Sequence, residues 1–592
     1  MILQALYEYA KRKGDALPED GFEWIEIKYL IKIREDGSFV DLVSTIEDKK
    51  GKAYLLPQKV GRSGSKSWQS PFLLWDNIGF VLREPKEIKD DEKKQKEANA
   101  YAENQNNAFI KKIESLPEDV KEDRGVAAVL KFYTSNKVNG FDKVRSSEYW
   151  EECKKSNGNI SFILNAETDL VAQTPAVTAY QKSLTIQNDD VEDPGAEKVV
   201  GTCLITGEKS LIARLHTATP ISGAKNIAKF VGFQKNSGYD SFGKEQSYNA
   251  PVSVKAMNAY TKALNYLIKS DKNHFTLGKD KDTVIFWAEK ENKEYDFEGV
   301  FSDFFSKDFD SDDPDKSVKE VKNLFAAIYT GKVERIDSNF YVLCLSPNAA
   351  RISVRFWETG KVKDFAERIQ RHFIDFDIVR APDDPEYLNL YKILSATAFE
   401  HKMENVAPNL IGSVVQSILK GTPYPVSLLQ QCIRRIRAEQ KVTRERAAIL
   451  KAYINRYNRF HGINEEVTVA LDRNCKNKGY LVGRLFAVLE KVQQDTHPRL
   501  NATITDRYYG AASTNPVTVF PQLLKLNQHH LSNYANKKTK SDRENELGEI
   551  INALDAFPPH LTLEEQARFA IGYYHEKQSF EKNNKSEGEI HE

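Results

Sequence analysis

Strand-like and helix-like patterns of apolar residues alternate along the first two thirds of the chain. Residues 25, 27, 29, 31 and 33 are isoleucine or tyrosine and mostly alternate with charged residues, a period of two that predicts a strand. Glu35-Asp36-Gly37 then predicts a hairpin turn. Further strands are predicted at residues 283–287, 338–346 and 351–357, and helices at residues 2–10 and 255–269.

From about residue 404 the patterns are helical. Thr443 is a predicted cap for a helix whose buried stripe contains Leu450, Tyr453 and Phe460. Asn515-Pro516 predicts a second helix start, and Thr562 with Glu565 predicts a capping box. We therefore predict an α+β fold: a mixed α/β part with antiparallel strands over residues 1–403, then a helical bundle over residues 404–592 with a polar tail at 579–592.

Two charged segments interrupt the first part. Residues 84–115 are rich in lysine, glutamate and amides and predict a solvated helix, with an insertion that orders on binding as the alternative. Residues 294–316 are acidic, and Asp308, Asp310 and Asp312 fit the first positions of a calcium loop. Asp313 and Lys319 occupy positions that need glycine and glutamate. We therefore expect a solvated acidic loop and no metal site.

The composition limits the classes of function. The 592 residues include 85 basic and 85 acidic residues, so the formal charge is zero and nucleic-acid contacts must come from local patches. The five cysteines are dispersed and form no Cys-x-x-Cys pair, which indicates a reducing compartment without a zinc ribbon. Apolar runs fall short of the ~20 residues that span a bilayer. We expect a cytoplasmic protein without membrane contact.

The loop over residues 57–77 is the first candidate binding segment. Gly61 and Gly64 permit close approach of a ligand to the backbone, and Arg62 and Lys66 supply positive charge. The same composition is typical of a surface linker that binds nothing, and the residue chemistry alone favours that alternative. The candidate contacts to duplex DNA are Gln58, Arg62, Ser63, Gly64, Ser65, Lys66 and Asn77.

A second polar loop precedes the helix at 255–269. Lys244, Gln246 and Asn249 can donate to phosphate or to base edges. The alternative is a hydrogen-bonded helix entry, which the chemistry of these residues favours. The three residues are nevertheless competing candidates for contacts to duplex DNA.

Residues 425–460 form the strongest basic segment, with nine basic and two acidic residues. Arg444, Lys451, Asn455 and Arg459 are predicted on the helix face opposite the buried stripe. We favour a nucleic-acid contact over a merely solvated face. The candidate contacts to the backbone of a DNA strand are Arg434, Arg435, Arg437, Lys441, Arg444, Lys451, Arg456 and Arg459.

Sequence motifs for catalysis are missing. The segment 575–579 lacks the second histidine of a zinc-binding helix, and no Gly-x-Ser-x-Gly elbow occurs. We therefore expect a non-catalytic protein without a cofactor.

Several motifs together resemble one family. The chain is similar to the large subunit of the type I-C (Dvulg subtype) CRISPR Cascade surveillance complex, and the similarity extends from end to end. One departure is Thr217-Ala218-Thr219-Pro220 after His216, where the family has a proline at once. The matching segments are MILQALYEYA at 1–10, RSGSK at 62–66, PFLLWDN at 71–77, TGEK at 206–209, IARLH at 212–216, GKEQSYNAPV at 243–252, LSPNAARISVR at 345–355 and GAAS at 510–513.

The resemblance implies a non-catalytic subunit that recognises the protospacer-adjacent motif in double-stranded DNA and helps to unwind the target. It also implies stabilisation of the displaced strand, recruitment of the helicase-nuclease, and partners that include guide-RNA-bearing backbone and foot subunits. The helical C-terminal part resembles the small subunit of related complexes, and a separate small subunit is a further expected partner. Our hypothesis is that residues 58–66 and Asn77 contact the motif duplex, whereas the helices at 434–459 line the path of the displaced strand.

Two other classes of function stay open. One is a metal-dependent nuclease that uses the carboxylates at 296–315, and the other is a purely structural assembly scaffold.

Overall fold

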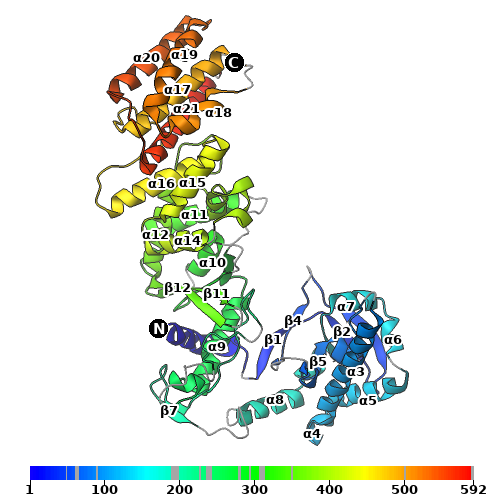
Figure 1. Ribbon diagram of the computed structural model, residues 1–592. Coiled ribbons are helices and arrows are strands. Elements are labelled where there is room, and N and C mark those ends of the chain that lie inside the picture. Colours follow the sequence, from blue (N-terminus) through cyan, green and yellow to red (C-terminus); the bar gives the residue numbers. More distant parts are fainter. Residues whose placement is uncertain are drawn as a thin grey trace. The chain divides into compact units, whose positions relative to one another are not determined.

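The computed structural model (Figure 1) describes the chain except residues 20, 48–49, 60–65, 89–90, 140, 189–198, 226–227, 235–242, 278–281, 293–294, 306–313, 349–350, 408, 499–501 and 589–592. Contacts divide it into two compact units. The first comprises Met1–Ala218 and Val231–Leu264, and the second Thr219–Phe230 and Asn265–Glu592. The predicted domain boundary at 403/404 stays a prediction; among the described residues the last strand ends at Lys361, and the chain is helical from Val362 onward.

The first unit is built on a mixed sheet. Its strand order is β3 (Phe39–Ser44), β2 (Tyr29–Ile33), β6 (Asn159–Leu164) and β5 (Trp75–Asn77), and β2 pairs with β6 in parallel. The predicted β2–β3 hairpin is confirmed.

The predicted continuous strand over residues 25–33 is wrong. It divides at Lys28, because β1 (Phe22–Ile27) pairs with β4 (Lys52–Pro57) instead of joining β2. The amide of Lys28 donates to the carbonyl of Asn159. The apolar alternation continues across this break, so the pattern alone could not show it.

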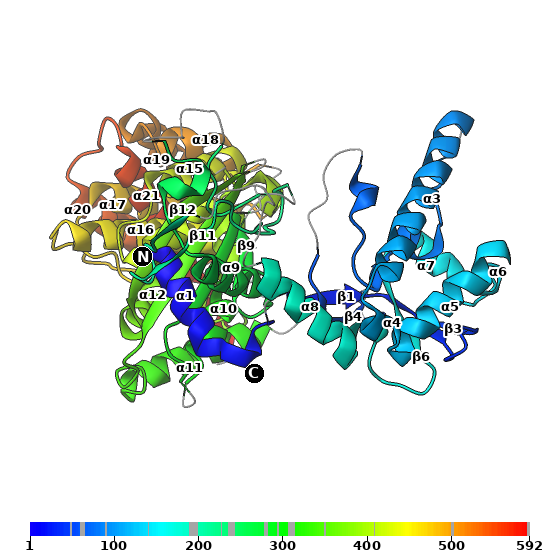
Figure 2. The ribbon, with the colours of Figure 1, turned by 90° about the horizontal axis from the view of Figure 1, so that it is seen from below.

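Helices cover the sheet of the first unit, and Figure 2 shows several of them from below. Phe109 of α3, Phe132 of α5 and Phe162 of β6 meet in one core. The charged segment predicted as a helix is confirmed as α3, which Asp91 caps by accepting from the Lys94 amide. The helices are α2 (Ile78–Leu82), α3 (Glu92–Glu114), α4 (Glu118–Lys121), α5 (Arg124–Asn139), α6 (Asp142–Arg145), α7 (Trp150–Ser156) and α8 (Pro175–Asn188).

The rest of the first unit contains α1 (Ile2–Lys13) and the hairpin of β7 (Val200–Thr202) and β8 (Lys209–Leu211). The helix α9 (Val254–Lys269) crosses the boundary between the units. Both predicted helices, at 2–10 and 255–269, are therefore confirmed.

The second unit begins with an antiparallel sheet in the order β12 (Arg351–Lys361), β11 (Asn339–Asn348), β10 (Asp282–Ala288) and β9 (His274–Leu277). These strands confirm the three segments predicted at 283–287, 338–346 and 351–357, except that β11 begins one residue later, at Asn339. The helices α10 (Phe297–Phe305), α11 (Pro314–Tyr329) and α12 (Val362–Phe376) share a core with it, where the rings of Phe286, Phe301 and Phe340 are in contact.

The segment predicted as an acidic loop at 294–316 is largely helical where it is described. Phe297, Phe301 and Phe305 pack into the core as one stripe of α10. Glu298 accepts from the Ala288 amide at 2.9 Å, so this carboxylate belongs to the fold. Asp308, Asp310, Asp312 and Asp313 lie outside the described residues.

The remainder of the second unit is helical, which confirms the α+β fold class. Thr443 caps α16 by accepting from the Arg446 amide, and Thr562 and Glu565 form the predicted reciprocal capping box. Helix α21 continues through most of the predicted polar tail. The helices are α13 (Leu390–Ser395), α14 (Leu410–Lys420), α15 (Val426–Glu439), α16 (Arg444–Phe460), α17 (Lys478–Thr496), α18 (Ile504–Ala512), α19 (Pro516–Ser532), α20 (Lys537–Leu554) and α21 (Leu563–Gly588).

Among the described residues, every helix is too short or too polar to cross a membrane.

Candidate nucleic-acid interface

The first predicted loop has both ends tied to the core of the first unit. At its start, the Trp75 indole donates to the Pro57 carbonyl at 3.0 Å, and the Gln58 amide donates to the Gly21 carbonyl. At its end, the Ser67 and Tyr101 hydroxyls lie 2.6 Å apart. Gln58 and Lys66 are exposed, whereas Arg62, Ser63, Gly64 and Ser65 lie outside the described residues. The polar loop therefore leaves from, and returns to, well-anchored positions.

The apolar motif after the loop has a structural role. Buried Asp76 accepts from the Phe72 amide at 2.9 Å, and the rings of Phe72 and Trp75 lie 4.5 Å apart. Asn77 caps α2, since its side chain accepts from the Gly79 amide at 3.1 Å. Its contact to DNA stays a prediction.

The second predicted loop is hydrogen-bonded within itself. Gln246 accepts from Arg214 at 2.6 Å, and Asn249 donates to the carbonyls of Lys244 and Gln246. These bonds build a 3₁₀ turn, Gln246–Asn249, ahead of α9. The geometry agrees with the helix-entry alternative for Gln246 and Asn249, and it leaves the Lys244 side chain exposed.

The predicted basic face of α16 is wrong. Arg444, Lys451 and Arg456 are buried, because α16 packs against α12, α13, α15 and α21. The side chain of Asn455 is buried as well, where it donates to the Val467 carbonyl. Phe460, placed in the buried stripe by its spacing, is 60% exposed.

Buried Asp375 of α12 neutralises part of this positive charge. Its carboxylate accepts from Arg456 at 2.8 Å and from Arg459 at 3.0 Å, and its carbonyl accepts from the Lys451 ammonium. Burial lowers the pKa of Lys451 from its ordinary value. These cations hold helices together, and their present positions do not expose Lys451 or Arg456 to DNA.

The exposed part of the predicted basic segment lies on and just after α15. Arg434, Arg437 and Lys441 are exposed, as is Arg459 at the end of α16. Arg435 is partly buried and forms an ion pair with Glu439 at 2.6 Å. The contacts of these residues to DNA stay predictions, but their exposure is compatible with them.

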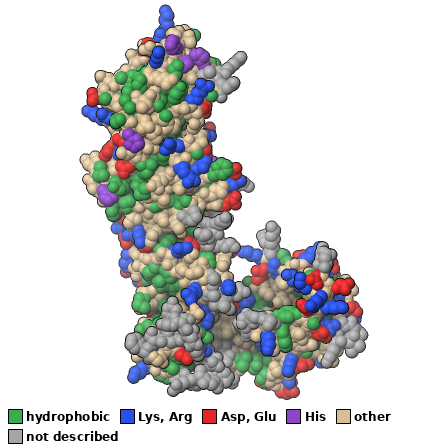
Figure 3. All heavy atoms as spheres, in the orientation of Figure 1, with side chains coloured by type: hydrophobic (Ala, Val, Ile, Leu, Met, Phe, Trp, Pro, Cys, Tyr) green, Lys and Arg blue, Asp and Glu red, His purple; other side chains and the backbone are tan. Residues whose placement is uncertain are grey.

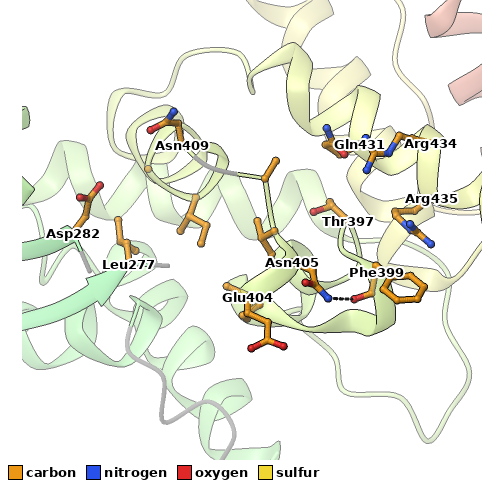
Figure 4. Close-up of a pocket in the computed structure, with 15 residues that line it drawn as sticks. Leu277, Asp282, Thr397, Phe399, Glu404, Asn405, Asn409, Gln431, Arg434 and Arg435 are labelled. Carbon is orange, nitrogen blue, oxygen red and sulfur yellow. Dashed lines mark hydrogen bonds between the residues drawn. The ribbon is translucent and has the colours of Figure 1, made fainter. Parts of the chain in front are cut away.

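Arg434 and Arg435 also line a pocket of about 460 Å³ within the second unit. Gln431, Arg434 and Arg435 share one face of α15, since they are spaced three and four residues apart. Figure 4 shows Phe399 near Arg435, with Asn405 beside it. The Arg435 guanidinium lies 5.3 Å from the centre of the Phe399 ring, and Asn405 donates to the Phe399 carbonyl at 3.1 Å.

The turn that carries Phe399 has an unusual backbone. Glu400 and His401 both have positive φ, at 55° and 54°, which costs about 1–2 kcal/mol for each residue with a side chain. Phe399 itself is 55% exposed. The two arginines were predicted from the sequence, but Phe399, Asn405 and Gln431 were not. The turn that carries Phe399 and Asn405 leaves no periodic pattern, and Gln431 of α15 has no charge to single it out.

Charge is mixed over the surface. On the face seen in Figure 3, lysine and arginine side chains alternate with aspartate and glutamate over both units, in agreement with the formal charge of zero. Any attraction for nucleic acid therefore has a short range.

Clusters of three or more histidine, cysteine or acidic side chains suited to a metal ion do not occur among the described residues. Residues 306–313, which carry several of the carboxylates of the nuclease alternative, lie outside them.

Comparison with known protein families defines the class. The model of a CRISPR-associated protein family matches residues 3–581, almost the whole chain. The chain therefore belongs to the Cas_Csd1 family of CRISPR-associated proteins. No curated protein matches the chain. The predicted CRISPR association is confirmed, and the type I-C assignment stays a prediction.

Proposed function

We propose that this protein is the non-catalytic large subunit of a type I-C Cascade surveillance complex. In this role it recognises the protospacer-adjacent motif in double-stranded DNA and helps to open the duplex. Membership of the Cas_Csd1 family over residues 3–581 is the observation that carries the proposal.

The charge of the protein suits such a role. In RNA-guided complexes base pairing reads the target, so the protein needs only a short motif contact and local attraction for the backbone. A chain with 85 basic and 85 acidic residues meets that requirement if its free cations are concentrated at a few places.

The loop over residues 57–77 is the proposed motif contact. Hydrogen bonds at Pro57 and Ser67 hold the chain on either side of residues 60–65 against the first unit. Gln58 and Lys66 extend into solvent at those ends. Arg62 supplies a guanidinium group that suits a phosphate or a guanine edge.

The proposed path of the displaced strand follows α15. Arg434, Arg437 and Lys441 offer exposed positive charge there, and Phe399 offers an exposed ring nearby. Cations combined with aromatic rings are typical of single-strand binding sites.

Proposed partners are the guide-RNA-bearing backbone and foot subunits, separate small subunits and the helicase-nuclease. The helicase-nuclease would supply the DNA cleavage, so this chain would need no metal or cofactor.

Substitution at the loop tests the proposal. In the assembled complex, Arg62→Ala with Lys66→Ala should weaken binding to motif-bearing duplex about tenfold, because two cationic contacts are lost. The matched control is Lys93→Ala with Lys96→Ala, which removes two exposed lysines of α3. Equal affinity of both double variants at several salt concentrations would contradict the loop assignment.

The other classes of function predict different results. A nuclease would cleave DNA as the isolated protein in the presence of magnesium. With a pure scaffold, complex lacking this chain would still bind target DNA normally.

A further inference from the structure

We propose that the pocket beside α15 receives one unstacked nucleotide of the displaced DNA strand. This inference rests on the proposed function and deepens it, since it assigns a ligand and a binding mode to one side of α15. The volume of about 460 Å³ lies in the range of small-ligand sites.

The two arginines of the pocket have different surroundings. Arg435 is already engaged with Glu439 and lies against the Phe399 ring. Arg434 is exposed, and among the described residues it has no hydrogen bond or ion pair. Arg434 is therefore the group available for a phosphate, whereas Arg435 positions Phe399.

Phe399 supplies the stacking surface. A base placed on an aromatic ring gains roughly fivefold or more in affinity, and this gain depends little on which base is present. The exposed ring is carried on the strained turn of Glu400 and His401, which anchors its backbone beside the pocket. The turn is further held by the Asn405 side chain, which donates to the Phe399 carbonyl.

Polar and acidic groups define the rest of the pocket. Gln431 and Asn409 bring amides that can bond to the edge of a base. Glu404 and Asp282 also line it; Asp282 is paired with Arg355, whereas the Glu404 carboxylate would repel a second phosphate backbone. A single strand with one base turned into the pocket therefore fits better than a duplex.

Photocrosslinking in the assembled complex tests this inference. The displaced strand carries 5-iodouracil at successive positions, and crosslinked peptides are identified by mass spectrometry. We expect crosslinks from one or two adjacent positions to the peptide that contains Phe399 and Met403, two residues that line the pocket.

Two variants separate occupancy of the pocket from reactivity of the ring. Phe399→Ala removes the reactive ring. Gly412→Leu keeps it and fills the pocket instead, because a Cβ at Gly412 has no other atom within 4 Å. Both should lower the crosslink yield roughly fivefold or more. The control Phe460→Ala removes a similarly exposed ring outside the lining of this pocket and should leave the yield unchanged.

Permanganate reactivity of the displaced strand reports separately whether the duplex opens. An open strand without crosslinks to this peptide, or with full yield in Gly412→Leu, overturns the inference and leaves the proposed function standing. Crosslinks only from 5-iodouracil placed in the guide RNA overturn the assignment to displaced DNA. A duplex that never opens overturns the proposed function, and the inference with it.

Discussion

At the scale of single residues, the main result is that several cations of the basic segment are structural. Arg456 is 3% exposed and Asp375 is 2% exposed, and they form a direct ion pair. Arg456 also lies 4.2 Å from the centre of the Tyr424 ring. Removal of one member of a buried pair leaves an uncompensated charge, which costs far more than the pair contributes.

Asp375→Asn should therefore lower the free energy of unfolding by about 3–5 kcal/mol. The measurement is chemical denaturation of the purified protein. Asp377→Asn is the control, since Asp377 is a neighbouring exposed carboxylate, and it should change the free energy by less than about 0.5 kcal/mol. Equal unfolding curves for the two variants would show that the pair at Asp375 contributes little.

At the scale of elements, the contact of α17 with α21 depends on glycine. A Cβ added at Gly483 would lie 2.0 Å from the Phe569 carbonyl oxygen, and one at Gly572 would lie 2.2 Å from the Tyr480 oxygen. The two helix backbones are therefore in direct contact at these points. The spacing of leucines and valines along α17 is that of an apolar helix face, but it assigns no role to the glycines.

Gly483→Ala should destabilise the protein by about 1–3 kcal/mol, because the helices must move apart. Gly510→Ala in α18 is the matched control: a Cβ there meets no other atom within 4 Å. Alanine favours helix over glycine by up to about 1 kcal/mol, so the control should be more stable than the natural protein. Opposite shifts in thermal unfolding temperature would bear this out, and stabilisation by both variants would contradict it.

At the scale of the whole molecule, the net charge is zero, so attraction to DNA depends on where exposed cations are placed. Of the eight residues proposed to contact the displaced strand, four are exposed, one is partly buried and three are buried. The exposed ones are Arg434, Arg437, Lys441 and Arg459, the partly buried one is Arg435, and the buried ones are Arg444, Lys451 and Arg456. Arg459 is engaged with Asp375, so Arg434, Arg437 and Lys441 are the exposed cations placed to exchange counterions with DNA. The salt dependence of binding should therefore follow α15 rather than α16.

The triple variant Arg434→Gln, Arg437→Gln and Lys441→Gln should show a shallower salt dependence of displaced-strand binding. In a plot of log K against log salt, the slope should fall in magnitude by about 2. The control variant Lys525→Gln, Lys537→Gln and Lys538→Gln removes the same charge from exposed positions on α19 and α20. Equal slopes in the two triple variants would exclude this part of α15 from the strand path.

Local signals in the sequence predicted much of the fold. The hairpin of β2 and β3, the strands β10 to β12, the caps of α16 and α21 and the helical nature of α3 all follow from spacing and capping residues, which act within a few positions along the chain. The same signals failed where an element depends on residues that are far away in the sequence. The strand divides at Lys28 because β1 pairs with β4 and β2 pairs with β6. Helix α10 forms because its phenylalanines pack into the core of the second unit.

The sequence by itself determined the class of this protein, because family membership and the net charge are properties of the linear chain. It also identified Arg434 and Arg435 as candidates from the local excess of charge. Only the tertiary structure decided which arginines are exposed to solvent. Arg456, for example, is buried against Asp375, which is 81 residues away in the sequence. The contact of Phe399 with Arg435 also depends on the tertiary structure, because the turn with positive φ that carries Phe399 leaves no periodic pattern in the sequence.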